Sequence, residues 1–203
     1  MDSARSDTAR PTYLTGTERP VKILIGGSFG VGKTTFIGSL SEIRPLRTEE
    51  KLTVASVGTD DLAGIESKTE TTVAMDFGRL TLVPGRIVLY LFGAPGQERF
   101  LPVLTDLSTG ALGALVLVDT RRLDAAWPVM ARIEEMGLPY AVAVNQFPDT
   151  QAHSAADLRT ALDLAPETPL VTCDARERES ARGALVTLVE YVLTRSRNAA
   201  VVR

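Results

Sequence analysis

The stretch Gly27-Ser28-Phe29-Gly30-Val31-Gly32-Lys33-Thr34 decides the fold of this 203-residue chain. It matches the phosphate-binding pattern G-x-x-x-x-G-K-[ST] in full, between an apolar run that predicts a strand and a stretch that predicts a helix. The glycines let successive backbone N–H groups converge on phosphate oxygens at the positive end of that helix. Lys33 adds a charge for the β- and γ-phosphates, Thr34 offers a hydroxyl to Mg²⁺, and Thr35 completes the predicted nucleotide-binding loop.

Short apolar runs bounded by glycine, proline and polar clusters predict six strands. Because Pro84-Gly85 is typical of a tight turn, the second and third strands are predicted to form an antiparallel hairpin. Helical patterns separate the others, so we expect an α/β fold with a mostly parallel six-stranded sheet, one antiparallel edge strand and helices on both faces. The six predicted strands are 21–25, 72–83, 86–92, 114–118, 140–144 and 170–172, and the polar segment 44–71 is expected to be irregular.

Three helix signals follow the phosphate loop. Asp124 is expected to cap a helix that Trp127 helps to pack, and Ser154-Ala-Ala-Asp157 resembles a capping box. Apolar residues at helical spacing from Ala181 to Val192 predict the last helix. The expected organisation is a flexible segment 1–20, one domain 21–195 and a short tail 196–203.

Composition excludes several classes of protein. The formal net charge of −3 gives no broad attraction to nucleic acid, and no apolar run approaches the roughly 20 residues needed to cross a bilayer. No secretory apolar region follows the N-terminus and no prenylation box ends the chain, so no direct membrane anchor is expected. The one cysteine, Cys173, is expected to be buried in a protein of the reducing cytoplasm, and His153 to lie in a solvated loop.

A second phosphate-facing segment, Gly93-Ala-Pro-Gly96-Gln97, directly follows a predicted strand. It resembles the end of the second switch of Ras-like small GTPases, Asp-x-x-Gly-Gln. The resemblance implies that the Gly96 N–H contacts the γ-phosphate and that Gln97 is the catalytic residue that orients the attacking water. Gly93 stands in place of the aspartate, as is typical of the MglA-type bacterial GTPases, and the chain looks most similar to the related GTPases of actinobacterial conservon operons.

The first switch of that family carries a threonine that binds Mg²⁺ and the γ-phosphate. Alignment of the apolar run before Asp76-Phe77 with the MglA type favours Thr72 for this role. The MglA type has an intrinsic arginine just before this threonine, whereas this chain has Thr71. Each threonine taken singly also fits a strand edge for packing reasons.

The family reads guanine with Asn-Lys-x-Asp and with a later Ser-Ala-Lys. Two segments that each follow a predicted strand correspond to these motifs. Gln146 replaces the lysine and the acidic residue comes one position late, so relaxed base selection is expected. The residues that the resemblance assigns to the base are Asn145, Gln146, Asp149, Asp174, Ala175 and Arg176.

The resemblance therefore implies a cytoplasmic GTP-binding switch that uses Mg²⁺ and hydrolyses GTP. Hydrolysis is expected to be slow without a partner, because Thr71 stands where the MglA type has its intrinsic arginine. The implied partners are a roadblock-type regulatory protein and a histidine-kinase-like membrane sensor, with recruitment to the membrane through a partner left open. Two alternatives stay open at this point: a nucleotide-binding interaction module with little or no hydrolysis, and a P-loop ATPase.

Overall fold

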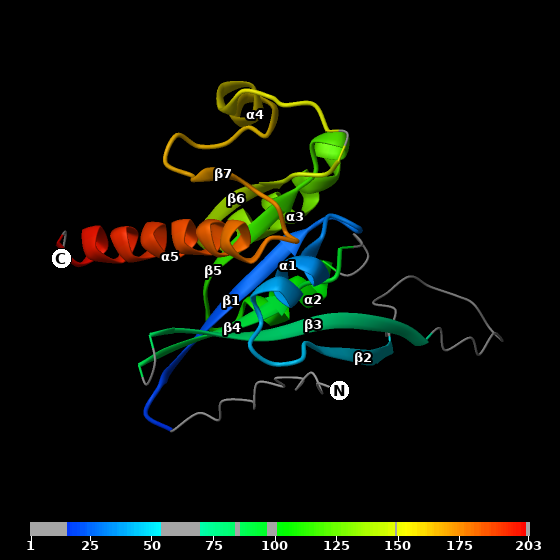
Figure 1. The fold of residues 1–203 in the computed structure, drawn as a ribbon, viewed down its shortest axis with the longest axis vertical. Coiled ribbons are helices and arrows are strands. Elements are labelled where there is room, and N and C mark those ends of the chain that lie inside the picture. Colours follow the sequence, from blue (N-terminus) through cyan, green and yellow to red (C-terminus); the bar gives the residue numbers. More distant parts are fainter. Residues whose placement is uncertain (1–15, 54–69, 84–85, 97–100, 149, 202–203) are drawn as a thin grey trace, which may run out of the picture.

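The computed structural model describes residues 16–53, 70–83, 86–96, 101–148 and 150–201. These residues form one seven-stranded sheet with helices on both faces, and the strand order is β2-β3-β4-β1-β5-β6-β7 (Figure 1). The strands are β1 Arg19–Gly27, β2 Leu46–Thr53, β3 Glu70–Val83, β4 Ile87–Gly93, β5 Ala111–Val118, β6 Tyr140–Asn145 and β7 Leu170–Cys173.

The central strands are parallel because helices connect them. β1 pairs in parallel with β4 and β5, and β6 pairs in parallel with β5 and β7, whereas β3 is antiparallel to both β2 and β4. The helices are α1 Lys33–Leu40, α2 Leu101–Ser108, the 3₁₀ helix η2 Thr120–Ala126, α3 Trp127–Glu135, α4 Ala155–Ala161 and α5 Arg178–Val201.

Alternation along β1 divides the core into two layers. Ile23 and Ile25 face one side of the sheet, where they pack in a cluster with residues of α1 and α5. Leu24 faces the other side, in a cluster with residues of α2 and α3. Both layers are fully buried around β1, which fixes the strand and the loop that follows it at the centre of the sheet.

The predicted α/β architecture is confirmed, with one addition at the edge. All six predicted strands are present, and the expected hairpin is the antiparallel pair β3–β4. The seventh strand, β2, lies in the segment that was expected to be irregular, so β3 is covered by a partner and is not the edge strand. Its sequence, Leu-Arg-Thr-Glu-Glu-Lys-Leu-Thr, is too polar to suggest a strand, and pairing with β3 supplies what its propensity does not.

The helix boundaries confirm one of the two predicted capping signals and correct the other. The Ser154 hydroxyl accepts a hydrogen bond from the Asp157 N–H at 3.1 Å at the start of α4, as predicted. Asp124 does not cap α3, because it lies inside η2, and α3 has no side-chain cap. The Asp119 carboxylate caps η2 and accepts from the Arg121 N–H. α5 continues to Val201, so helix extends through most of the expected tail.

Three single residues were assigned from the sequence. Cys173 is buried at the end of β7 and His153 is exposed just before the Ser154 cap, as expected. Trp127 begins α3 and is 54% exposed, so its part in packing the helix is smaller than expected. Within the described ranges, no helix combines the length and the apolar character that crossing a membrane requires.

Candidate functional site

The loop between β1 and α1 has the backbone that the phosphate-binding motif requires. Gly27 and Gly32 have φ angles of +133° and +104°, a region that side chains strongly disfavour. A Cβ at Gly27 would also lie 2.5 Å from the Leu117 carbonyl oxygen. Lys33 folds back over the loop, and its ammonium donates to the carbonyls of Gly27 and Ser28, both at 2.7 Å. The motif therefore forms a curled loop closed by its own lysine.

The ammonium of Lys33 is partly withdrawn from water. Burial lowers the pKa of Lys33 from its ordinary value to about 8, and the negative charge of Asp76 opposes this shift. An anionic ligand at the loop would favour the charged form and raise this pKa again. The lysine is thus arranged for a negative ligand, as its place in the motif indicated.

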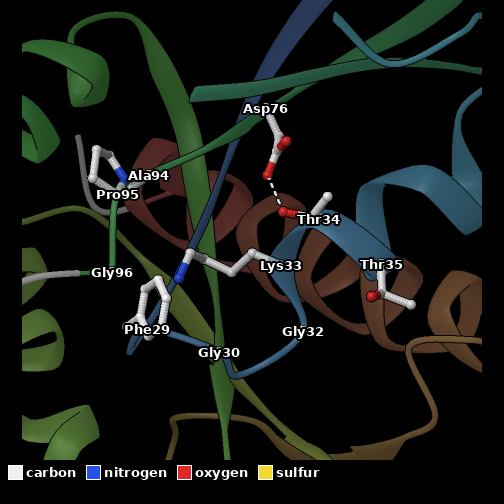
Figure 2. A pocket seen from close by; sticks show the side chains of 10 residues that line it. All are labelled: Phe29, Gly30, Gly32, Lys33, Thr34, Thr35, Asp76, Ala94, Pro95 and Gly96. Atoms are coloured by element: carbon white, nitrogen blue, oxygen red, sulfur yellow. Dashed lines mark hydrogen bonds between the residues drawn. The ribbon is translucent and has the colours of Figure 1, made fainter. Parts of the chain in front are cut away.

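Asp76 is a candidate site residue that the sequence alone did not indicate. It lies on β3, and its carboxylate accepts a hydrogen bond from the Thr34 hydroxyl at 2.5 Å (Figure 2). In the β3–β4 register, Asp76 stands directly opposite Gly93, the position where the small GTPases have their aspartate. A carboxylate thus reaches the Thr34 hydroxyl from β3, although β4 has glycine at the position of the family's aspartate.

The segment after β4 lies against the phosphate loop. The Ala94 N–H donates to the Ile25 carbonyl at 2.9 Å, which carries the chain across the end of β1. A Cβ at Gly96 would lie 2.5 Å from the Phe29 nitrogen and 2.6 Å from the Lys33 ammonium. Gly96 is thus brought to the phosphate side of the loop, as predicted, and only glycine fits there. Gln97, the predicted catalytic residue, lies outside the described residues.

Thr72, the predicted second ligand of the metal, is not brought to the site. It lies on β3 opposite Lys51, four residues before Asp76. At roughly 3.3 Å per residue, its backbone is about 13 Å further along the strand than that of Asp76. In this arrangement the residue of β3 that contacts Thr34 is Asp76.

The predicted base-contacting residues gather at the ends of β6 and β7. The Asn145 side chain, which is buried, donates to the Val31 carbonyl and accepts from the Ala175 N–H, both at 2.9 Å. It thereby joins the phosphate loop to the loop after β7. The N–H of Ala175, a residue that the resemblance assigns to the base, is occupied by this bond.

An ion pair and two uncharged side chains line the rest of the base-contacting region. Arg176 donates two side-chain hydrogen bonds to the Asp174 carboxylate, at 2.9 and 2.6 Å, and these bonds lower the pKa of Asp174 to about 2. Gln146 and Phe147 line the same side. Asp149 lies outside the described residues, so its predicted contact with the base stays a prediction.

Two cavities join these regions into one groove. A cavity of about 440 Å³ is lined by Lys33, Asp76 and Gly96, among others, and a smaller one of about 110 Å³ lies between Asn145 and Arg176. Both are lined by Gly32 and Thr35, so they meet at the start of α1. The larger volume is typical of small-molecule sites. The groove runs from a phosphate-type end to a base-type end.

A second group that the sequence analysis missed lies beside this groove, at the end of β5. The Arg121 guanidinium makes paired hydrogen bonds to the buried Asp119 carboxylate and lies 4.0 Å from the centre of the Phe147 ring. Arg122 donates to the Phe29 carbonyl at 3.0 Å. The Arg121-Arg122 dipeptide matches no motif in the sequence. The directions of the two side chains depend on the turn that Asp119 caps. No cluster of three or more metal-binding acidic, histidine or cysteine side chains occurs in the part of the chain that the structure describes.

Solved structures with this fold include the G domain of the FeoB iron transporter of T. maritima, with a TM-score of 0.59, 17% identity and coverage of 85% of this chain and 99% of that one. The FeoB G domain of Methanococcus jannaschii has a TM-score of 0.57 and 13% identity, with coverage of 86% of this chain and 98% of that one. The cytosolic domain of the T. maritima FeoB iron transporter in its GMPPNP form has a TM-score of 0.58 and 18% identity, with coverage of 85% of this chain and 64% of that one. The chain thus has the P-loop GTPase fold.

No curated protein matches the sequence. Residues 25–195 match a family described as conserved hypothetical ATP binding protein. The match begins in β1, just before the phosphate loop, and ends in α5, so it contains both ends of the groove. The chain belongs to this family.

Proposed function

We propose that this chain is a small GTP-binding protein that binds and slowly hydrolyses GTP as a molecular switch in bacterial signalling. The observation that carries the proposal is the Thr34–Asp76 pair beside the Lys33 loop. A hydroxyl and a carboxylate at the mouth of a phosphate-binding loop are hard oxygen ligands, which Mg²⁺ prefers.

Thr34 and Asp76 fit this metal and would hold it, directly or through water, without a dedicated acidic cluster. Bound there, Mg²⁺ would neutralise charge on the β- and γ-phosphates. Lys33 supplies a second positive charge, and the N–H groups of the loop orient the phosphate oxygens. In the proposed reaction, the Gln97 side chain orients the water that attacks the γ-phosphorus, and the Gly96 N–H holds a γ-oxygen.

The base identity is the least constrained part of the proposal. The FeoB neighbours are titled as G domains, whereas the family description names ATP. Because Asn145 occupies the Ala175 N–H, the donor for the guanine oxygen has to be released on binding. This favours GTP with relaxed selection over strict guanine recognition, and it keeps a P-loop ATPase as the alternative.

Competition titrations test the proposal. With Mg²⁺ present, GTP and GDP should displace a fluorescent nucleotide more strongly than ATP and ADP, and Lys33→Ala should abolish binding while the domain stays folded. A wild-type protein that binds ATP as well as GTP would replace the guanine assignment. Binding that survives Lys33→Ala would remove the phosphate site from this loop.

A single-turnover assay separates the switch from the alternative of a binding module with little hydrolysis. That alternative is favoured by the close approach of Gly96 to Lys33, which leaves little room for a γ-phosphate unless the segment moves. Slow GTP hydrolysis that falls at least about tenfold in Gln97→Ala supports the switch. Tight binding without turnover, with and without cellular extract, supports the module.

The proposed setting is the cytoplasm, with a roadblock-type regulator and a histidine-kinase-like membrane sensor as partners. The support is the resemblance of the two switch segments to those of the MglA-type and conservon GTPases. Co-purification with tagged protein held in its GDP-bound and GTP-bound forms tests these partners.

A further inference from the structure

We propose that Arg122 is a built-in positioning arginine, which holds and polarises the Phe29–Gly30 peptide of the phosphate loop. The inference rests on the proposed nucleotide site and deepens it. The sequence has Thr71 where the MglA type has its intrinsic arginine, and slow hydrolysis without a partner is expected. The geometry assigns a cation to the loop from within the chain, at the end of β5.

The contact is short and directed at the loop itself. The Arg122 guanidinium donates to the Phe29 carbonyl oxygen at 3.0 Å across 93 positions of sequence. A Cβ on Gly30 would lie 3.6 Å from the same guanidinium nitrogen. Arg122 therefore lies against the loop at its middle.

The position of Arg122 is fixed by a buried carboxylate. The Asp119 side chain has no exposed surface, and it lies 2.8 Å from Arg121 and 3.8 Å from Arg122. Hydrogen bonds from Arg121 lower the pKa of Asp119, so the carboxylate is charged at neutral pH. Burying a charge of this kind adds little net stability, whereas it can fix one geometry. Asp119 thus orients the turn so that one arginine points to each side.

The two arginines have different tasks. Arg121 uses its paired hydrogen bonds on Asp119 and covers the Phe147 ring on the base side of the groove. Arg122 is left half-exposed, with its hydrogen bond directed to the phosphate loop. The turn after β5 therefore touches both ends of the nucleotide groove.

The consequence for phosphate binding follows from the chemistry of one peptide group. The Phe29 carbonyl and the Gly30 N–H belong to the same amide, so a cation on the oxygen withdraws electrons from the nitrogen and makes the N–H a stronger donor. Among the described residues, the Gly30 N–H has no hydrogen-bond partner. Phe29 and Gly30 both line the phosphate cavity. Arg122 thus delivers positive charge to the phosphates through the loop, without entering the cavity.

The test uses full-length protein and three substitutions of Arg122. Arg122→Met removes charge and hydrogen bond, Arg122→Gln keeps a donor without the charge, and Arg122→Lys keeps the charge. Since Arg122 is half-exposed and Arg121 still pairs with Asp119, the folded domain should tolerate all three. Arg132→Met is the matched control, because Arg132 bonds to Thr105 and Glu135 away from the groove.

Two readouts are compared, the amide resonance of Gly30 in nucleotide-free protein and the Kd for Mg²⁺–GDP. A charge-assisted bond is roughly twice as strong as a neutral one, so Arg122→Met should weaken GDP binding about fivefold to tenfold. It should also shift the Gly30 resonance upfield, with Arg122→Gln intermediate, Arg122→Lys close to wild type and Arg132→Met unchanged.

A Gly30 resonance and a Kd that stay unchanged in Arg122→Met and Arg122→Gln would overturn the proposal, as would equal losses in Arg132→Met. A wild-type protein that binds no nucleotide refutes the proposed function instead. In that case the Gly30 resonance still decides whether Arg122 polarises the loop.

Discussion

Raising the pH should weaken nucleotide binding in a way that identifies Lys33 as the titrating group. The Lys33 pKa is about 8 in the empty loop, because burial outweighs the attraction of Asp76. A phosphate ligand favours the charged lysine, so binding raises this pKa and takes up a proton above pH 8. The apparent Kd should then be flat below the pKa of the free protein and rise above it.

The expected size follows from that value. If the bound lysine regains at least its ordinary pKa of 10.5, the Kd for GDP increases about tenfold between pH 7 and pH 9. The stability of the nucleotide-free domain should change with pH in the opposite direction to the nucleotide affinity. The unfolded chain binds more protons than the folded one between the two pKa values, so stability increases as pH rises from 8 to 10.5. Opposite trends cannot come from a general loosening of the fold at alkaline pH.

Isothermal titration at pH 7, 8 and 9 measures the Kd, and urea unfolding at the same values measures stability. Lys33→Met is the control in the unfolding experiment, since it has no ammonium at position 33 and should lose the increase in stability above pH 8. A wild-type Kd that stays constant within twofold would refute the reasoning. It would mean that Lys33 remains fully charged in the empty loop and is better hydrated than its burial indicates.

Three further variants probe separate parts of the groove. Asp76→Asn should reduce the effect of Mg²⁺ on GDP affinity at least about tenfold, measured by titration with EDTA and with Mg²⁺. An unchanged effect of Mg²⁺ would reject Asp76 as a metal residue. Gly96→Ala places a methyl group 2.5 Å from the Phe29 nitrogen, so the segment has to shift away from the loop and the ratio of GTP to GDP affinity should change. A normal ratio would show that the segment does not approach the loop. Asn145→Ala leaves two backbone groups unpaired and should cost about 2–4 kcal/mol in urea unfolding, and a loss below 1 kcal/mol would show that water replaces the side chain.

The parts of the fold that follow from sequence are those where local chemistry and tertiary role coincide. Val31 and Gly32 lie in a motif whose backbone, lysine and following helix all serve one task, and the structure has them as predicted. The strand β2 could not be predicted, because Glu49 and Glu50 have low strand propensity and the strand exists only through pairing with β3. The missing information was the partner strand, which no local pattern contains.

The arginines at the end of β5 show the same limit at the site. An Arg-Arg dipeptide after a strand is ordinarily a solvated turn, and only the buried Asp119 carboxylate two and three residues earlier distinguishes it. An aspartate directly after a buried strand was the available signal. Its position predicts a side chain at the carboxyl edge of the sheet, where ligands bind in this class of fold.

Asp76 and Gly93 explain each other once the register is known. They face each other across the β3–β4 pair, where opposed Cα atoms are about 4.5–5.5 Å apart. A Cβ at Gly93 would lie 3.1 Å from the Cβ of Asp76 and 2.9 Å from the Ile37 side chain, so a side chain at position 93 would crowd both residues. Glycine at 93 leaves this space to Asp76. The residue that departs from the family's aspartate thus accommodates the carboxylate that the neighbouring strand brings to Thr34.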